Sequence, residues 1–264
     1  MAKKNHELPP ILITSCVKTS ANYTALRDQN TRIELTVNAI NEWLKINSLL
    51  KIVVCDGSGI NFSGRLRREF PLAQIEFIHF KNNYKLVKIY GKGYGEGQIV
   101  EYALKKSKFL KCSPFFAKCT SKLVVKNFMQ VIELWNGNFI FDAKFINVGI
   151  IKNLLGLVSV RSISLILIDT RFYIVDKKKY LKFFSKSHLD VRDSERYILE
   201  HAFRDVILSH KIRNFMLSFP FLIEGVSGTS GKSYRKNNIF SYIKKCLHRQ
   251  IIRKHPLYKN FFVS

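Results

Sequence analysis

The chain has 264 residues, of which 47% are hydrophobic and 24% charged, and these ordinary proportions exclude disorder, collagen and a coiled coil as the main architecture. Its 44 lysines and arginines, against 19 aspartates and glutamates, give a formal charge of +25. A surface this basic attracts nucleic acid, anionic lipid or phosphorylated small molecules, and the charge alone does not choose among them.

The sequence contains no membrane-spanning segment, because charged residues interrupt its most apolar region, 145–175. The first residues, MAKKNHELPP, lack the apolar run of a signal peptide, so we expect a cytoplasmic protein. The five cysteines form no CxxC pair and their number is odd, which argues against both a zinc site and a disulfide framework.

Strand and helix patterns alternate in the first part of the chain, and the second part is less regular. The expected strands cover 11–17, 51–55, 75–80, 115–125, 139–148, 165–168 and 219–223. The expected helices cover 31–47, 62–70, a segment after 95, 177–185 and 194–208. This alternation is typical of an α/β domain with a mostly parallel sheet. We expect that domain over 1–224, followed over 225–264 by a Gly/Ser loop and a basic helical tail.

Ligands of open α/β sheets bind at the carboxyl ends of the strands. Ser15 ends the first predicted strand, and Asp56 and Ser58 follow the second in a Gly-Ser turn. An aspartate there can accept hydrogen bonds from a nucleobase or ribose, or it can simply cap a helix and start the turn. The glycine run 91–95 with Lys92, before a helix, suits a phosphate, and a plain flexible turn is the alternative.

Lys118, Thr120 and Lys122 alternate along a predicted strand and therefore share one face, where they can hold a diphosphate or form an exposed basic strand. Asp169 and Arg171 follow the predicted strand 165–168 and can form an ion pair. The loop 225–233 ends in Gly-Lys-Ser without the P-loop spacing, which leaves a loop over bound substrate or an inert linker.

Acidic residues cluster between 190 and 201. Asp193 and Ser194 are natural N-caps, so helix initiation explains part of the cluster. Glu200 and His201 lie further into the predicted helix, and one of them is a candidate general base facing the cleft.

The order of these motifs resembles bacterial surface-polysaccharide glycosyltransferases, which build capsule, O-antigen or lipopolysaccharide. The similar segments cover nearly the whole chain and read Asp56-Gly-Ser58, Gly91-Lys-Gly-x-Gly-Glu96, Phe116-x-Lys118-x-Thr120, Asp169-Thr-Arg-Phe172, Leu199-Glu-His201 and the glycines of 225–231. Two departures stand out. The family pattern Lys-x-Thr-Gly-Arg is Lys118-Cys-Thr-Ser-Lys122 here, and the sequence has no Asp-x-Asp motif.

The resemblance implies a GT-A-like, Rossmann-like mixed sheet flanked by helices and a hexosyltransferase activity. It implies donor binding by Ser15, Asp56, Ser58, Lys92, Glu96, Lys118, Thr120 and Lys122. It also implies acceptor binding by Asp169, Arg171, His201, Gly228 and Gly231. We expect Glu200 to be the catalytic base, with Asp193 and Glu195 as further candidates.

Without Asp-x-Asp we expect no metal and no other cofactor, with lysines neutralising the donor diphosphate. The expected partners are a nucleotide-sugar donor, a glycan or lipid-linked acceptor and no specific nucleic acid. Ile239, Ile243, Leu247 and Ile251 recur every four residues in a tail without acids, so we expect a basic amphipathic helix at the inner face of the cell membrane. A terminal helix packed on the core is the alternative.

Two other functions compete with this interpretation. A nucleic-acid-binding protein fits the charge and the aromatic content, since aromatic rings stack on bases, although no recognised binding motif occurs. An inactive glycosyltransferase-like protein fits the departure at Ser121 and Lys122.

Overall fold

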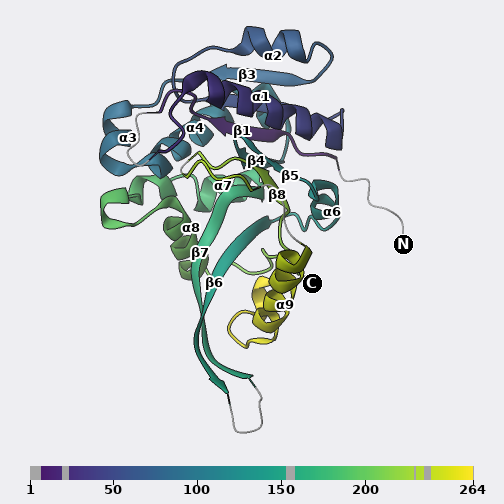
Figure 1. The fold of residues 1–264 in the computed structure, drawn as a ribbon, viewed down its shortest axis with the longest axis vertical. Coiled ribbons are helices and arrows are strands. Elements are labelled where there is room, and N and C mark those ends of the chain that lie inside the picture. Colours follow the sequence, from purple (N-terminus) through teal and green to yellow (C-terminus); the bar gives the residue numbers. More distant parts are fainter. Residues whose placement is uncertain (1–6, 20–23, 153–157, 229, 235–238, 264) are drawn as a thin grey trace.

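The computed structural model of the protein describes residues 7–19, 24–152, 158–228, 230–234 and 239–263, and it describes only the backbone of residues 147–152, 158–162, 239 and 241. Its centre is a six-stranded mixed sheet in the order β3-β2-β1-β4-β7-β6 (Figure 1). The strands are β1 (Ile11–Ser15), β2 (Ile52–Asp56), β3 (Ile75–His79), β4 (Phe115–Thr120), β6 (Phe139–Lys152) and β7 (Val158–Asp176). The first four of these run parallel, and β7 and β6 are antiparallel to their neighbours.

Helices cover both faces of the sheet. They are α1 (Gln29–Ile46), α2 (Ser63–Glu69), α3 (Tyr84–Tyr90), α4 (Lys92–Lys106), α5 (Lys108–Cys112), α6 (Phe128–Glu133), α7 (Lys177–Phe183), α8 (Leu199–Ser209) and α9 (Ile239–Lys254). Side chains of α1, α2 and α6 pack on one face around Trp43 and Phe172. Side chains of α3, α4, α7 and α8 pack on the other around Phe116 and Tyr173. Burial on both faces explains why β1 and β2 are continuous apolar runs.

The mixed sheet flanked by helices is the architecture that the sequence predicts, and three strand predictions need correction. A turn at Ser121 and Lys122 divides the predicted strand 115–125 into β4 and β5 (Leu123–Val125). The segment 165–168 is the interior of the 19-residue β7, which forms a long hairpin with β6 (Figure 1). The last strand is β8 (Ile223–Gly225), and it pairs with β5 outside the main sheet.

The glycine run at 91–95 is not a loop, because α4 begins at Lys92. Glycines let neighbouring segments approach this helix closely. A Cβ on Gly97 would lie 2.1 Å from Cβ of His188, in the 3-10 helix Ser187–Asp190. Within the run itself, a Cβ on Gly93 would lie 2.9 Å from Cβ of Leu199, so this glycine also allows close packing.

The predicted helix 194–208 is also shorter than expected. Asp193–Glu195 forms a separate 3-10 turn, and Arg196 adopts a left-handed φ of 59°. Backbone hydrogen bonds in both directions between Arg192 and Tyr197 close this segment, and α8 starts only at Leu199. Asp193 and Ser194 therefore do not cap α8, and Glu200 lies in its first turn.

The C-terminal segment packs against the rest of the molecule. Arg249 and Ile252 of α9 are buried, and Phe261 accepts backbone hydrogen bonds from Phe215 and Met216. The expected boundary between 224 and 225 falls inside β8. Among the described helices, none combines the length and the apolar character needed to cross a membrane.

We predict that Gly97→Ala destabilises the protein by about 1–3 kcal/mol, because the new methyl group overpacks the contact with His188. Gly64→Ala is the matched control. Gly64 also lies in a helix, with no atom near its missing Cβ, so alanine there should stabilise by up to about 1 kcal/mol. Urea unfolding measures both, and equal midpoints would contradict the packing role of Gly97.

Candidate active site

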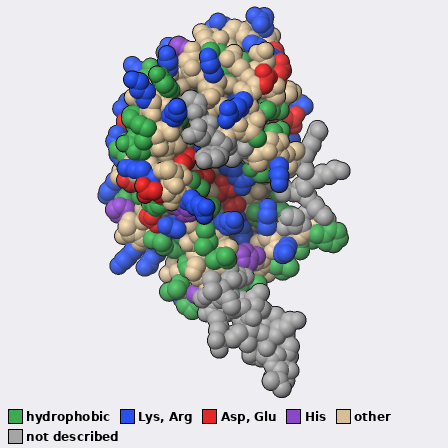
Figure 2. Space-filling model, turned by 60° about the vertical axis from the view of Figure 1, so that its left-hand side comes forward, with side chains coloured by type: hydrophobic (Ala, Val, Ile, Leu, Met, Phe, Trp, Pro, Cys, Tyr) green, Lys and Arg blue, Asp and Glu red, His purple; other side chains and the backbone are tan. Residues whose placement is uncertain are grey.

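A cleft of about 910 Å³ opens at the carboxyl ends of β1, β2 and β4. Such a volume lies within the range of small-molecule sites. The space-filling view shows a hollow on one face in which acidic and basic side chains lie side by side (Figure 2). The position agrees with the rule that ligands of open α/β sheets bind where the strands end.

Four buried polar atoms in the cleft lining have no hydrogen-bond partner within the described part of the chain. They are Oγ1 of Thr14, Oγ of Ser15, Oδ1 of Asn82 and Oδ1 of Asp193. A buried polar group left unpaired costs roughly 1–3 kcal/mol, so this arrangement suits a site that receives a polar ligand. The sequence analysis selected Ser15 and Asp193 but missed Thr14 and Asn82, although both lie at or just beyond the ends of strands.

Asp56 does not line the cleft. Its Oδ2 accepts a hydrogen bond from the backbone N–H of Val17 (3.0 Å), and its Oδ1 accepts one from the N–H of Ser58 (2.8 Å). These bonds connect the loop after β1 to the turn after β2. Asp56 therefore has the turn-forming role and is not placed to bind a nucleoside, whereas Ser58 does line the cleft.

Two buried cations, Arg32 and Lys122, line the cleft without an ion pair to any described residue. Arg32 donates to the carbonyl oxygens of Cys16 and Leu26, both at 2.8 Å, and the Lys122 ammonium donates to Oγ of Ser121 at 2.9 Å. Burial, reinforced by the charge of Arg32, lowers the pKa of Lys122 to about 7. An anion bound here would restore the charged form of Lys122.

Gly228 marks the space beside these two cations. A Cβ placed on Gly228 would lie 3.4 Å from Nη1 of Arg32 and 3.6 Å from Nζ of Lys122. Lys122 itself sits in the turn between β4 and β5 with a left-handed φ of 73°, so it does not share a strand face with Lys118. Arg32 escaped the sequence analysis because one arginine within a helical pattern carries no motif.

Lys118 is fully buried and does not line the cleft. Its ammonium donates to the Glu96 carboxylate, to Oγ1 of Thr120 (3.0 Å) and to the carbonyl oxygen of Thr170 (2.7 Å). Glu96 and Thr120 do line the cleft. Lys118, which the sequence predicts to bind the donor, is thus a positioning residue. It holds a side chain of α4, a side chain of β4 and a backbone carbonyl of β7 around one charge.

Glu200 lines the cleft from the first turn of α8. Burial raises the pKa of its carboxyl group, and the carboxylates of Glu96 and Asp169 raise it further, while a hydrogen bond with the Thr170 side chain opposes the shift. A carboxylate with a raised pKa is suited to general base catalysis near neutral pH.

The other acidic candidates differ in position. Asp193 lines the cleft, burial raises its pKa, and its Oδ2 accepts a hydrogen bond from the backbone N–H of Lys92 (3.1 Å). Lys92 also lines the cleft. Glu195 is exposed and lies outside it. The structure therefore brings Glu200 and Asp193 to one site and excludes Glu195.

The predicted acceptor residues are also divided. Arg171 lines the cleft, pairs with Asp169 (Nε to Oδ1, 2.9 Å) and packs on the ring of Tyr234, which the sequence analysis missed. Gly228 lines the cleft, but Gly231 is exposed and lies outside it. His201 is outside as well, and its Nδ1 accepts the backbone N–H of Ile198 at the start of α8.

Two acidic residues in or near the cleft already have partners. The oxygens of Asp56 are used in backbone hydrogen bonds, and Glu96 is paired with Lys118. Among the residues that the structure describes, no group of three metal-ligating side chains comes together.

No family model matches the chain, and no curated protein sequence matches it. Its fold is similar to HddC from Yersinia pseudotuberculosis in complex with GMP-PN (TM-score 0.39, 11% identity, 65% of this chain and 78% of HddC). It is also similar to the glycosyltransferase GlyE of Streptococcus pneumoniae (0.45, 10%, 80% and 45%) and to the bifunctional glycosyltransferase WbbM (0.44, 12%, 95% and 45%). Because these TM-scores are low, we draw nothing about activity from them.

We predict that Lys118→Met destabilises the protein by about 3 kcal/mol or more, because it leaves the Glu96 carboxylate and two further acceptors without their donor. Lys105→Met is the control, since Lys105 forms a comparable but exposed pair with Glu101 on the same helix. Chemical unfolding compares the two.

Adding Glu96→Gln to Lys118→Met should restore part of the lost stability, because the half-buried carboxylate of Glu96 is then no longer left without its cation. If Lys118→Met proved as stable as Lys105→Met, the central role of this ammonium would be contradicted.

Proposed function

We propose that this protein is a glycosyltransferase that moves a sugar from a nucleotide-sugar donor to an acceptor hydroxyl. The observation that carries the proposal is that one cleft contains both kinds of group the reaction needs. Its lining includes two buried cations that form no ion pair with a described residue, Arg32 and Lys122, and a carboxylate with a raised pKa, Glu200. The cations are suited to binding the donor diphosphate, and the carboxylate is suited to taking the proton of the acceptor hydroxyl.

Arg32 and Lys122 would bind the donor diphosphate, with Lys92 near the start of α4. Charge-assisted hydrogen bonds to phosphate are the strong ones, and a guanidinium can bind two oxygens at once. The unpaired oxygens of Thr14 and Ser15 would hydrogen-bond the donor at the strand ends. The positive charge takes the role that a metal has in many related enzymes, so we propose a metal-independent reaction.

Glu200 would act as the general base. It takes the proton of the acceptor hydroxyl as the oxygen attacks the anomeric carbon of the donor sugar. The bond from that carbon to the diphosphate oxygen breaks, and the nucleoside diphosphate leaves with the electron pair. Arg32 and Lys122 stabilise the charge that develops on the leaving group, in a site that already holds them in place.

The finer assignment rests on the sequence resemblance. On that resemblance we propose a hexosyltransferase that takes part in building bacterial capsule, O-antigen or lipopolysaccharide, with a glycan or lipid-linked acceptor at the inner face of the cell membrane. A thermal-shift panel of nucleotide sugars would identify the donor, and a donor that stabilises the protein saturably supports the proposal.

We predict that Glu200→Gln lowers turnover roughly 100-fold or more and leaves donor affinity within about twofold, because the amide keeps the shape but cannot take a proton. Glu195→Gln is the matched control, and it should be fully active because Glu195 lies outside the cleft. Release of nucleoside diphosphate, measured in EDTA and again with added Mg²⁺ or Mn²⁺, reports turnover. Full activity of Glu200→Gln would exclude this residue as the base, and a strict need for the metal would exclude the metal-independent reaction.

The pH profile gives a further readout of the same variant. A base works only when deprotonated, so activity should fall as the pH drops through the raised pKa of Glu200. The acid limb should therefore lie above the ordinary glutamate pKa of about 4.3.

The outer face of α9 supports association with an anionic membrane. Phe240, Ile243, Leu247 and Ile251 are between 46% and 73% exposed, while Arg249 and Ile252 on the other side are buried. The helix is therefore packed on the core, as in the simpler alternative, and still presents an apolar stripe outward. Other exposed basic residues of the same helix, such as Arg253 and Lys254, lie on an acid-free segment and favour anionic lipid.

We predict that the protein co-sediments with vesicles containing phosphatidylglycerol and that high salt releases it. Leu247→Gln should weaken this binding several-fold, because part of the buried apolar area is lost. Leu72→Gln is the control, since Leu72 is a highly exposed leucine far from α9 in sequence. If both variants lost vesicle binding to the same extent, or if neither lost it, the result would show that α9 is not the segment that binds the membrane.

A further inference from the structure

A second cavity of about 470 Å³ lies beside the cleft, between β6, β7, α9 and the start of α8. Arg171, Ile198 and Glu200 line both cavities. Glu200 therefore stands at their junction. A molecule held in the second cavity can reach the same carboxylate as a donor held in the first.

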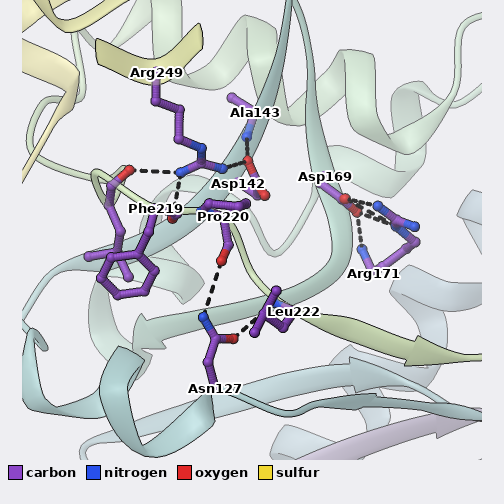
Figure 3. Close-up of polar contacts among 10 residues, drawn as sticks. Asn127, Asp142, Ala143, Asp169, Arg171, Phe219, Pro220, Leu222 and Arg249 are labelled. Carbon is purple, nitrogen blue, oxygen red and sulfur yellow. Dashed lines mark hydrogen bonds and ion pairs between the residues drawn. The ribbon is translucent and has the colours of Figure 1, made fainter. Parts of the chain in front are cut away.

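Arg249 fixes α9 as one wall of this cavity. Its guanidinium donates to the carbonyl oxygens of Leu217 (2.7 Å) and Phe219 (2.8 Å) and pairs with the Asp142 carboxylate on β6 (Figure 3). Because Arg249 is buried and all these partners belong to the main body, the helix is held in a defined position.

The side chains that line this cavity include four lysines and arginines and three acidic residues, of which Glu200 alone is outside the two ion pairs described next. Arg249 neutralises Asp142, and Arg171 neutralises Asp169 on the neighbouring strand (Figure 3). Lys144 of β6 and Lys245 of α9 also line the cavity, and neither forms an ion pair with a described residue. Lys245 precedes Arg249 by four residues and so lies on the same face of α9.

We propose that the second cavity is the acceptor site and that it takes an acceptor with a phosphate or diphosphate group. Lys144 and Lys245 bind that group, and the acceptor hydroxyl reaches Glu200. This inference rests on the proposed function. Two lysines without acidic partners suit a doubly charged phosphate ester better than a neutral sugar, which needs no cation. The phosphate ester is either a free sugar phosphate or one carried on a lipid.

The test uses glucose 1-phosphate as the probe, with the first cavity saturated by nucleoside diphosphate. In calorimetry the probe should bind as a second ligand, while glucose itself should not. Lys245→Glu should weaken its binding roughly tenfold or more, because a charge-assisted contact becomes a repulsive one. Lys244→Glu is the matched control. It makes the same charge change on the adjacent residue, outside the cavity, and should leave the affinity within about twofold.

The same titration with a polyprenyl-phosphate hexose in phosphatidylcholine vesicles distinguishes the two sources. Dependence on Lys245 in either form supports the phosphate site and identifies its source. Equal binding by the Lys245→Glu and Lys244→Glu variants in both forms overturns it. If wild-type protein fails to bind nucleoside diphosphate but binds the probe through Lys245, the proposed function is overturned and the phosphate site stands.

Discussion

The buried ammonium group of Lys118 holds the site together. An ammonium without water is costly, and here it is stabilised by a carboxylate of α4, a hydroxyl of β4 and a backbone carbonyl of β7. The β7 residue that offers this carbonyl, Thr170, also bonds through its side chain to Glu200. Lys118 and Glu200 therefore contact the same residue of β7, although Lys118 itself does not line the cleft.

The cleft differs from this network because its charges are not balanced. Arg32 and Lys122 are both buried and lie close to Gly228, and neither forms an ion pair with a described residue. Folding leaves Lys122 close to half-charged near neutral pH, since its pKa falls to about 7. Such an arrangement favours an incoming anion, and the left-handed backbone at Lys122 is the kind of local strain that persists at functional sites.

The first strands are predicted from apolar runs, and the predictions of β1 and β2 are confirmed because both strands are buried on both faces of the sheet. The roles of single residues were harder to predict. Asp56, at the end of β2, and Lys118, within β4, have side chains that could bind a nucleotide. Hydrogen bonds within the protein already occupy both side chains. Arg32 contributes to the site from a helix distant in sequence, which only the folded contacts reveal. The motif predicts Glu200, but its raised pKa comes first from burial and then from two neighbouring carboxylates, and the sequence displays neither cause.

The most direct test of the central claim is the proton balance of nucleoside diphosphate binding. At about pH 8 free Lys122 is mostly neutral, so binding a diphosphate should draw a proton onto it, and calorimetry in buffers of different ionisation enthalpy measures that uptake. The arginine of the Lys122→Arg variant is positively charged at this pH, so the variant should bind the diphosphate without proton uptake. The account predicts uptake in the wild type and its loss in the arginine variant. Absence of binding, or the same proton uptake in both proteins, would contradict it.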